Sequence, residues 1–173
     1  MRSVELLLDA DGDAAVRRAW AALMAADLPS AGRHSGATNA PHITLAVCPG
    51  EAAGGVADAA RLAGLAATLP RPVELSGLVL FGGGDRRVLA CHVVVDEAML
   101  RLQRDVVARL GGAGGVLAQT APGAWTPHVT LARRMPLARL ETALEVCGPV
   151  DLRVEAVAMR VWDSVAKRVT VVA

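Results

Sequence analysis

The sequence contains one short segment twice. Residues 41–46 read Pro-His-Ile-Thr-Leu-Ala and residues 127–132 read Pro-His-Val-Thr-Leu-Ala, so five of six residues agree across a separation of 86 positions. A predicted strand and a predicted helix precede each copy at nearly the same offset. Internal similarity of this kind indicates a duplicated structural unit. We therefore expect two βαβαβ halves of about 85 residues, packed as two lobes around a pseudo-twofold axis.

Hydrophobic periodicity and turn residues predict the elements of each half. Strands are expected over residues 4–8, 42–47, 73–81, 87–95, 127–133, 150–161 and 167–172. Helices are expected from a cap at Asp13 to just before Pro29, over 55–69 and 97–110, and from Pro136 to just before Gly148. Three glycines, Gly82 to Gly84, supply the tight reversal of a hairpin between the third and fourth strands.

Charge and aromatic content limit the partners that this protein can bind. The 18 basic and 17 acidic residues give a formal net charge of +1, and the only aromatic residues are Trp20, Phe81, Trp125 and Trp162. Long nucleic acids are held by a broad positive field, and single strands by many stacked bases. We therefore expect no long nucleic-acid tract as a partner. A small or terminal phosphate remains open as a ligand. Of the basic residues 17 are Arg, which suits bidentate phosphate contacts, with codon bias of the genome as the alternative explanation.

The cysteines and the apolar runs indicate the compartment. Cys48, Cys91 and Cys147 are odd in number and widely separated, which favours neither a disulfide framework nor a thiolate zinc cluster. No run of 18 uncharged apolar residues is present, so we expect no membrane span and no membrane partner. Glu5 and Asp9 interrupt the first apolar run before it reaches the length of a signal sequence. The expected protein is a cytoplasmic monomer.

The repeated segment carries a pattern with chemical meaning. Side chains alternate along a strand, so His42 and Thr44 share one face, and His128 and Thr130 share the corresponding face of the second copy. By the same alternation Ala46, Cys48 and Ala132 are expected on that face. The intervening apolar residues must face a core, which directs the histidines and threonines elsewhere. In a duplicated fold the two strands lie near the axis, so both pairs are expected to face one cleft.

Two histidines and two threonines fit phosphodiester chemistry. Cleavage needs a base for the attacking oxygen, an acid for the leaving oxygen, and donors for the nonbridging oxygens. Histidines with a pKa near 6.5 can divide the first two tasks. A threonine two residues on lies about 6.5 Å along the strand, within reach of the same phosphate. Neither His42 nor His128 has another ligand at metal-binding spacing on its strand, so we expect no metal and no cofactor.

The two segments resemble the paired H-x-T-hydrophobic motifs of the 2H phosphoesterase superfamily, in its 2′-5′ RNA ligase and cyclic phosphodiesterase branch. The hairpin with Gly77, Phe81, Arg87, Val88 and Leu89 is also similar to that family. The resemblance implies an α+β fold, bilobal and duplicated, with mainly antiparallel sheets around a central cleft. The 173 residues then form one domain, with lobes over approximately residues 1–84 and 85–173.

The same resemblance assigns an activity and its residues. It implies metal-independent opening of the 2′,3′-cyclic phosphate of a nucleotide or RNA end to a 2′-phosphate, with reversible 2′-5′ RNA ligation as a further activity. His42 and His128 are then acid and base, and Thr44 and Thr130 bind the phosphate. For hydrolysis we favour His128 as the base that activates water and His42 as the acid, although the reversed assignment fits the sequence equally well.

Three further residues are candidates for substrate contacts. An Arg after the second motif often contacts phosphate or substrate in relatives, which points to Arg133. In a straight strand Arg133 and Arg134 lie about 16 to 20 Å from His128, so contact requires a bend or bulge, and solvation at a strand end is the alternative. Relatives often carry an aromatic residue where this chain has Ala90. Trp125 or Phe81 is therefore the candidate to stack on a base in place of that aromatic residue. For Trp125, a role as the anchor of its loop is an equally weighted alternative.

Two other functions remain open at this point. One is a binding protein that recognises a nucleotide or RNA terminus without turnover. The other is hydrolysis of a cyclic phosphate that is not RNA, such as an ADP-ribose derivative. Intact acid and base positions in both motifs favour the enzyme.

Overall fold

The computed structural model describes residues 1–49 and 55–173. Its strands are β1 (Arg2–Leu8), β2 (His42–Cys48), β3 (Arg71–Phe81), β4 (Arg86–Val94), β5 (His128–Pro136), β6 (Asp151–Asp163) and β7 (Arg168–Val172). The helices are α1 (Ala10–Ala25), α2 (Gly55–Ala66), α3 (Glu97–Arg109) and α4 (Leu140–Cys147). Every strand and helix expected from the sequence is present, with ends that differ by a few residues.

Two predicted helix starts are wrong. Helix α1 begins directly after β1, and its cap is Asp9, whose carboxylate accepts a hydrogen bond of 2.8 Å from the backbone N–H of Gly12. Asp13 lies inside the helix and pairs with Arg17 one turn later. Pro136 ends β5 instead of opening a helix. A short 3₁₀ turn over Leu137–Arg139 separates it from α4.

The seven strands form one antiparallel sheet in the order β1-β2-β5-β4-β3-β6-β7, and β1 also pairs with β6. Strand β6 is long enough to pair with three strands, with residues 151–156 beside β3, residues 156–163 beside β1 and residues 159–163 beside β7. The two copies of the repeated segment, β2 and β5, are adjacent and meet at one residue pair. The α+β class with mainly antiparallel pairing is confirmed.

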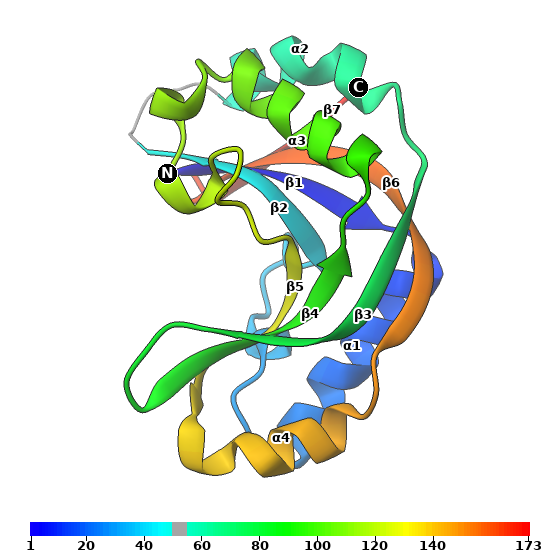
Figure 1. Ribbon diagram of the computed structural model, residues 1–173, viewed down its shortest axis with the longest axis vertical. Coiled ribbons are helices and arrows are strands. Elements are labelled where there is room, and N and C mark those ends of the chain that lie inside the picture. The colour runs from blue at the N-terminus through cyan, green and yellow to red at the C-terminus, as the bar shows by residue number, and fades with distance from the viewer. Residues whose placement is uncertain (50–54) are drawn as a thin grey trace.

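The two sequence halves are interleaved in this sheet. Strand β3 of the first half pairs with β4 of the second, and β6 of the second half pairs with β1 of the first. The helices also pack across the two halves. Helix α2 of the first half packs against α3 of the second at one end of the molecule, and α1 packs against α4 at the other (Figure 1). The boundary expected near residue 84 therefore does not separate groups of paired strands. A single domain over residues 1–173 stays a prediction.

The core lies between the helices and the apolar face of the strands. Ile43 and Leu45 of β2, and Val129 and Leu131 of β5, are fully buried, as their alternation with His and Thr predicts. Burial of these side chains fixes which face of each repeated strand is turned away from the core. Among the described residues, no helix has the length and apolar character that a membrane crossing requires.

Candidate active site

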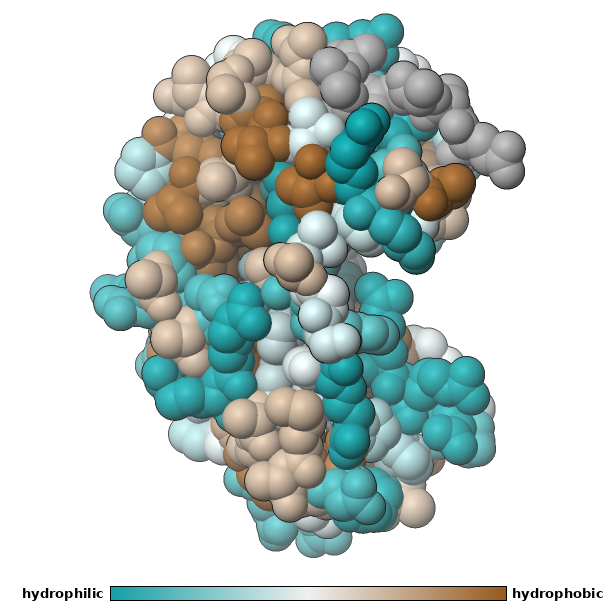
Figure 2. All heavy atoms as spheres, turned by 180° about the vertical axis from the view of Figure 1, so that it is seen from behind, coloured by the Kyte–Doolittle hydropathy of each residue, from teal (hydrophilic) through white to brown (hydrophobic). Residues whose placement is uncertain are grey.

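A cleft of about 830 Å³ brings the two repeated motifs together. His42, Thr44, His128 and Thr130 all line it, as the sequence predicts. Figure 2 shows the surface hollowed at one edge, between the end that carries α2 and α3 and the end that carries α4. The expected central cleft is therefore present, and β2 and β5 form its middle.

The single pair between β2 and β5 sets the arrangement of the four side chains. Ile43 is opposite Val129, and the strands are antiparallel. In such a pair the preceding residue of one strand lies opposite the following residue of the other. His42 is thus beside Thr130, and Thr44 is beside His128. Each histidine therefore shares its part of the cleft with the threonine of the other motif.

Both imidazoles are held in the same way. Nδ1 of His42 lies 2.7 Å from the carbonyl oxygen of Ala40, and Nδ1 of His128 lies 2.8 Å from that of Thr126. A carbonyl only accepts, so each Nδ1 must carry the proton and donate it. Nε2 is then a proton acceptor in the neutral ring and a proton donor in the charged ring. Either histidine can act as base or acid through the same atom.

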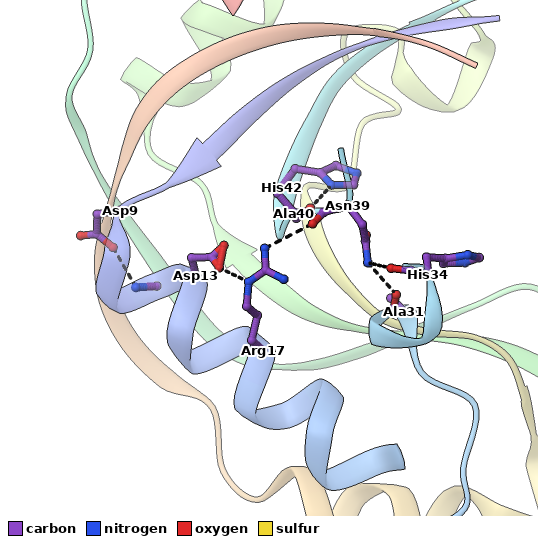
Figure 3. Close-up of polar contacts among 9 residues, drawn as sticks. Asp9, Asp13, Arg17, Ala31, His34, Asn39, Ala40 and His42 are labelled. Atoms are coloured by element: carbon purple, nitrogen blue, oxygen red, sulfur yellow. Dashed lines mark hydrogen bonds and ion pairs between the residues drawn. The ribbon is translucent and has the colours of Figure 1, made fainter. Parts of the chain in front are cut away.

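A loop docked on α1 supports the ring of His42 (Figure 3). Asn39 donates from its side-chain amide to the carbonyls of Ala31 and His34, at 3.1 and 2.9 Å. Its own carbonyl accepts from Arg17 at 3.2 Å. These contacts fix the backbone just before Ala40, the residue that orients His42. The ring of His34 points away from His42 in Figure 3 and does not line the cleft.

Strand β2 has a bulge directly after the motif threonine, Thr44. Val4 of β1 pairs with Ala46, and the next residue, Glu5, pairs with Thr44. Leu45 is therefore an extra residue without a partner on β1. An extra residue shifts the alternation of side chains by one position.

Strand β5 has a bulge at the equivalent place. Leu89 of β4 pairs with Ala132, and the next residue, Ala90, pairs with Thr130. Leu131 is the extra residue here, 86 positions after its counterpart in β2. The duplication therefore preserves an irregular feature of the backbone as well as the motif. Ala90 occupies the place in the second half that Glu5 occupies in the first.

The expected facing of the residues that follow Leu45 and Leu131 is wrong, because of the two bulges. Ala46, Cys48 and Ala132 were expected beside the histidines, but all three are buried in the core. Val47 and Arg133, at equivalent places in the two copies, line the cleft instead. A single inserted residue in each strand is the cause, because it exchanges the two faces from that point onward.

Arg133 reaches the cleft through this irregular backbone. The bulge at Leu131 turns Arg133 to the face of His128, and a second irregularity follows between the pairs of β4 and β5. Arg134, with φ of 58°, lies in the left-handed region at this point and does not line the cleft. The bulge that a contact by Arg133 requires is therefore present.

The backbone carbonyl oxygens of the two motif threonines accept hydrogen bonds from tryptophan side chains. Trp125 donates from Nε1 to the carbonyl of Thr44 at 2.8 Å, and Trp20 donates to the carbonyl of Thr130 at 3.0 Å. Both carbonyls lie next to a bulge, where the regular ladder is interrupted. Trp125 thus anchors the backbone of the first motif, and its ring also lines the cleft. Trp125 is therefore an anchor of the backbone, and base stacking by the same side chain stays a prediction.

The surroundings of His128 favour its neutral form. Burial lowers the pKa of His128 below its ordinary value, and the charges of His42 and Arg133 lower it further. The hydrogen bond to the carbonyl of Thr126 acts in the opposite direction. The ring of Phe81 packs against that of His128, with centroids 4.5 Å apart and planes inclined by 45°. Phe81 also lines the cleft.

A carboxylate that the sequence analysis missed lies beside His42. Oε1 of Glu5 is 3.7 Å from Nε2 of His42 and accepts a hydrogen bond of 2.6 Å from the hydroxyl of Ser3. Oε2 accepts one of 2.8 Å from Nε of Arg160. Glu5 is only 3% exposed, and it lines the cleft. The only available signal was a charged residue inside a short apolar run.

Trp162 is a second residue that the sequence analysis missed. It lies on β6 opposite Ser3 of β1 and lines the cleft. Three of the four aromatic residues of the chain, Phe81, Trp125 and Trp162, therefore line this one cleft. The wide sequence separation of these residues concealed their proximity.

The described residues contain no group of three or more His, Cys, Asp or Glu side chains placed to hold a metal ion. The polar side chains that line the cleft include the imidazoles of His42 and His128, the hydroxyls of Thr44 and Thr130, the carboxylate of Glu5 and the guanidiniums of Arg2 and Arg133. Such a set can donate protons to an anion and accept protons from a water or a hydroxyl.

Comparison with known proteins places this chain. A sequence model described as the 2′-5′ RNA ligase superfamily matches residues 9–166. No curated protein sequence matches. Among solved structures, TT0787 of Thermus thermophilus is similar, with a TM-score of 0.63 and 20% identity over 99% of this chain and 94% of that one.

Two further structures share the fold. LigT of E. coli in its apo form has a TM-score of 0.60 and 15% identity over 99% of this chain and 94% of its own. Usb1 of Kluyveromyces marxianus with uridine monophosphate has a TM-score of 0.55 and 13% identity, over 99% of this chain and 96% of its own. LigT has also been solved in complex with 3′-AMP. At these identities the likeness concerns the fold.

Proposed function

Because the chain belongs to the 2′-5′ RNA ligase superfamily, we propose that it opens the 2′,3′-cyclic phosphate of a nucleotide or RNA end to a 2′-phosphate. Membership confirms the family resemblance and supports phosphoesterase or ligase activity in general. The observation that carries the proposal is the matched pair of imidazoles, each with Nδ1 bound to a carbonyl and Nε2 left for proton transfer in one cleft. Nucleotide complexes of LigT and Usb1 support a nucleotide as ligand.

The proposed reaction uses only groups of this chain and water. A water oxygen attacks the phosphorus while Nε2 of neutral His128 takes its proton. The bond from phosphorus to O3′ breaks, and Nε2–H of charged His42 protonates that oxygen. The product has a 2′-phosphate and a free 3′-hydroxyl. Thr44 and Thr130 donate hydroxyl hydrogen bonds to the nonbridging oxygens, and Arg133 supplies positive charge. Ligation would run the same steps with a hydroxyl in place of water.

The assignment of base and acid follows from the different surroundings of the two rings. Burial and positive neighbours hold the pKa of His128 low, so this ring is neutral and able to accept a proton at neutral pH. His42 instead has the carboxylate of Glu5 within ion-pair distance. These features support His128 as the base in hydrolysis and His42 as the acid.

We expect a bell-shaped dependence of kcat/KM on pH. The base must be neutral and the acid charged, so the rate rises as His128 loses its proton and falls as His42 loses its proton. Because the pKa of His128 is lowered, the rising limb should lie below pH ~6.5, the ordinary value for histidine. Initial rates with a nucleoside 2′,3′-cyclic phosphate, in EDTA throughout, provide the measurement. A rate that rises monotonically with pH and disappears in EDTA would contradict the two-histidine mechanism.

The same assay separates the competing functions. Turnover in EDTA supports the phosphoesterase. Binding of the nucleoside cyclic phosphate without turnover indicates a recognition protein. Turnover of an ADP-ribose cyclic phosphate alone identifies a substrate that is not RNA.

Arg133 and Arg134 form a matched pair for testing the phosphate site. We expect Arg133→Gln to lower kcat/KM by about 10- to 100-fold, because a charge-assisted contact to the phosphate is lost. Arg134→Gln should change it less than about threefold, since Arg134 lies outside the cleft lining. Both variants are compared with wild type in steady-state assays at low and high salt. Equal effects of the two substitutions would show that Arg133 acts through general surface charge.

A further inference from the structure

Two differences between the repeats give the cleft opposite charges on its two sides. The backbone of the two motifs is equivalent, including the bulges. At the position opposite the motif threonine the first half has Glu5 and the second half has Ala90. Two residues after the bulge residue the first half has Val47 and the second half has Arg133. The carboxylate of Glu5 therefore lies beside His42, and the guanidinium of Arg133 acts on His128. Arg2 also lines the cleft, where it is paired with the carboxylate of Asp58.

The position of Glu5 links it to the reacting atom. Nδ1 of His42 is bound to the carbonyl of Ala40, so Nε2 is the atom available to the substrate. Oε1 of Glu5 is 3.7 Å from that same Nε2. Arg160 and Ser3 bind the carboxylate and fix its orientation, and Arg160 is itself fixed by a bond of 2.9 Å to the carbonyl of Thr38.

We propose that Glu5 is a positioning residue that makes His42 the acid of the reaction. A carboxylate beside Nε2 stabilises the charged imidazole and, through the charge of that ring, helps to keep His128 neutral. It also repels the phosphate, so the phosphate is drawn toward Arg133 and the leaving sugar oxygen lies nearer to His42. The backbone does not distinguish the two histidines, because Nδ1 of each is bound to the carbonyl of the residue two positions before it. The assignment of catalytic roles rests on the proposed phosphoesterase function.

Other charged groups surround His42 on the neighbouring elements. Glu5 faces it from β1, Arg160 lies behind Glu5 on β6, and His128 and Arg133 face it from β5. Arg17 of α1 contacts the preceding loop at the carbonyl of Asn39. Among these neighbours in the described structure, Glu5 is the group whose charge favours a proton on His42.

Glu5→Gln tests the proposal with little change of shape. The amide oxygen still accepts from Arg160, but the negative charge is lost. We expect the falling limb of the kcat/KM profile to move to lower pH by about half to one unit, and the rising limb to move much less. At a pH on the falling limb, this shift lowers kcat/KM by about three- to tenfold. A uniform loss at every pH would assign Glu5 a structural role only and overturn the proposal.

Asp58→Asn is the matched control. Asp58 is buried and accepts a hydrogen bond of 2.9 Å from Nε of Arg2, but it does not line the cleft. This variant removes one buried, ion-paired carboxylate, as Glu5→Gln does. Both limbs of its pH profile should move less than in Glu5→Gln, because Asp58 acts on the cleft only through its partner Arg2, which lines it. A shift equal to that of Glu5→Gln would show that any buried carboxylate has the effect, and would contradict a specific role for Glu5.

Titration of the histidine side chains by NMR makes the test independent of activity. Signals are assigned with His42→Ala and His128→Ala, and wild type is compared with Glu5→Gln. Glu5→Gln should narrow the gap between the titration midpoints of the two rings, because the negative charge beside Nε2 of His42 is lost. An unchanged gap overturns the role of Glu5 even in an active enzyme. A narrowed gap in a protein that turns over no cyclic phosphate leaves the charge assignment intact and refutes the proposed function.

Discussion

Replacing either cleft histidine by alanine should lower kcat for a nucleoside 2′,3′-cyclic phosphate by roughly 10²- to 10⁴-fold. His42→Ala removes the proton donor for the leaving oxygen, and His128→Ala removes the acceptor for the water proton. Both rings are half-buried at the cleft, where their removal leaves the apolar core intact. Circular dichroism and thermal unfolding should therefore show a folded protein. Loss of activity through unfolding is thereby distinguished from loss of chemistry.

The double variant and a third histidine sharpen this experiment. Acid and base act in the same transition state, so His42→Ala combined with His128→Ala should lose much less than the product of the two single effects. His34→Ala should retain wild-type turnover, because its ring is exposed and lies outside the cleft lining. A single variant of His42 or His128 that retains most of its activity would show that this site works by another mechanism.

Removing the motif hydroxyls should produce the second largest loss. We expect Thr44→Val and Thr130→Val each to lower kcat by about 10²-fold, the lower end of the loss seen when one donor to a developing oxyanion is removed. Valine has nearly the shape of threonine and keeps the β-branched side chain of the strand, so the fold should persist. Single-turnover rates at saturating substrate separate this loss of chemistry from weaker binding.

Conservative variants supply the controls for the threonines. Thr44→Ser and Thr130→Ser keep the hydroxyl and should recover most of the lost rate. Thr170→Val, on β7 outside the cleft lining, should leave kcat unchanged. If the valine variants of the motif residues keep kcat close to that of wild type, the hydroxyls do not contact the phosphate in the transition state.

The repeated motif was sufficient to predict that four side chains meet in one cleft. His42, Thr44, His128 and Thr130 follow from two local rules, the alternation of a strand and the pseudo-symmetry of a duplication. Both rules need only residues that are close in sequence or related by the repeat. The helices and strands were predictable for the same reason, except at two helix starts: Asp9 rather than Asp13 provides the cap of α1, and Pro136 ends β5 instead of opening α4.

The positions of the two bulges could not be predicted from the sequence. Leu45 and Leu131 look like ordinary apolar strand residues, and nothing local marks either as the one without a partner. Register is decided between strands, when both apolar faces are buried together. The facing of Val47 and Arg133 was therefore a tertiary outcome.

The sequence by itself determined the elements, the motif pairs and the face that each pair presents, because strand periodicity and internal repetition are properties of the chain. Only the tertiary structure decided how the halves are interleaved and which other residues reach the cleft. Glu5 and Arg160 lie 155 positions apart and become partners through the pairing of β1 with β6. The charge difference between the two sides of the cleft arises from such long-range pairings, which are selected by burial and register over the whole sheet.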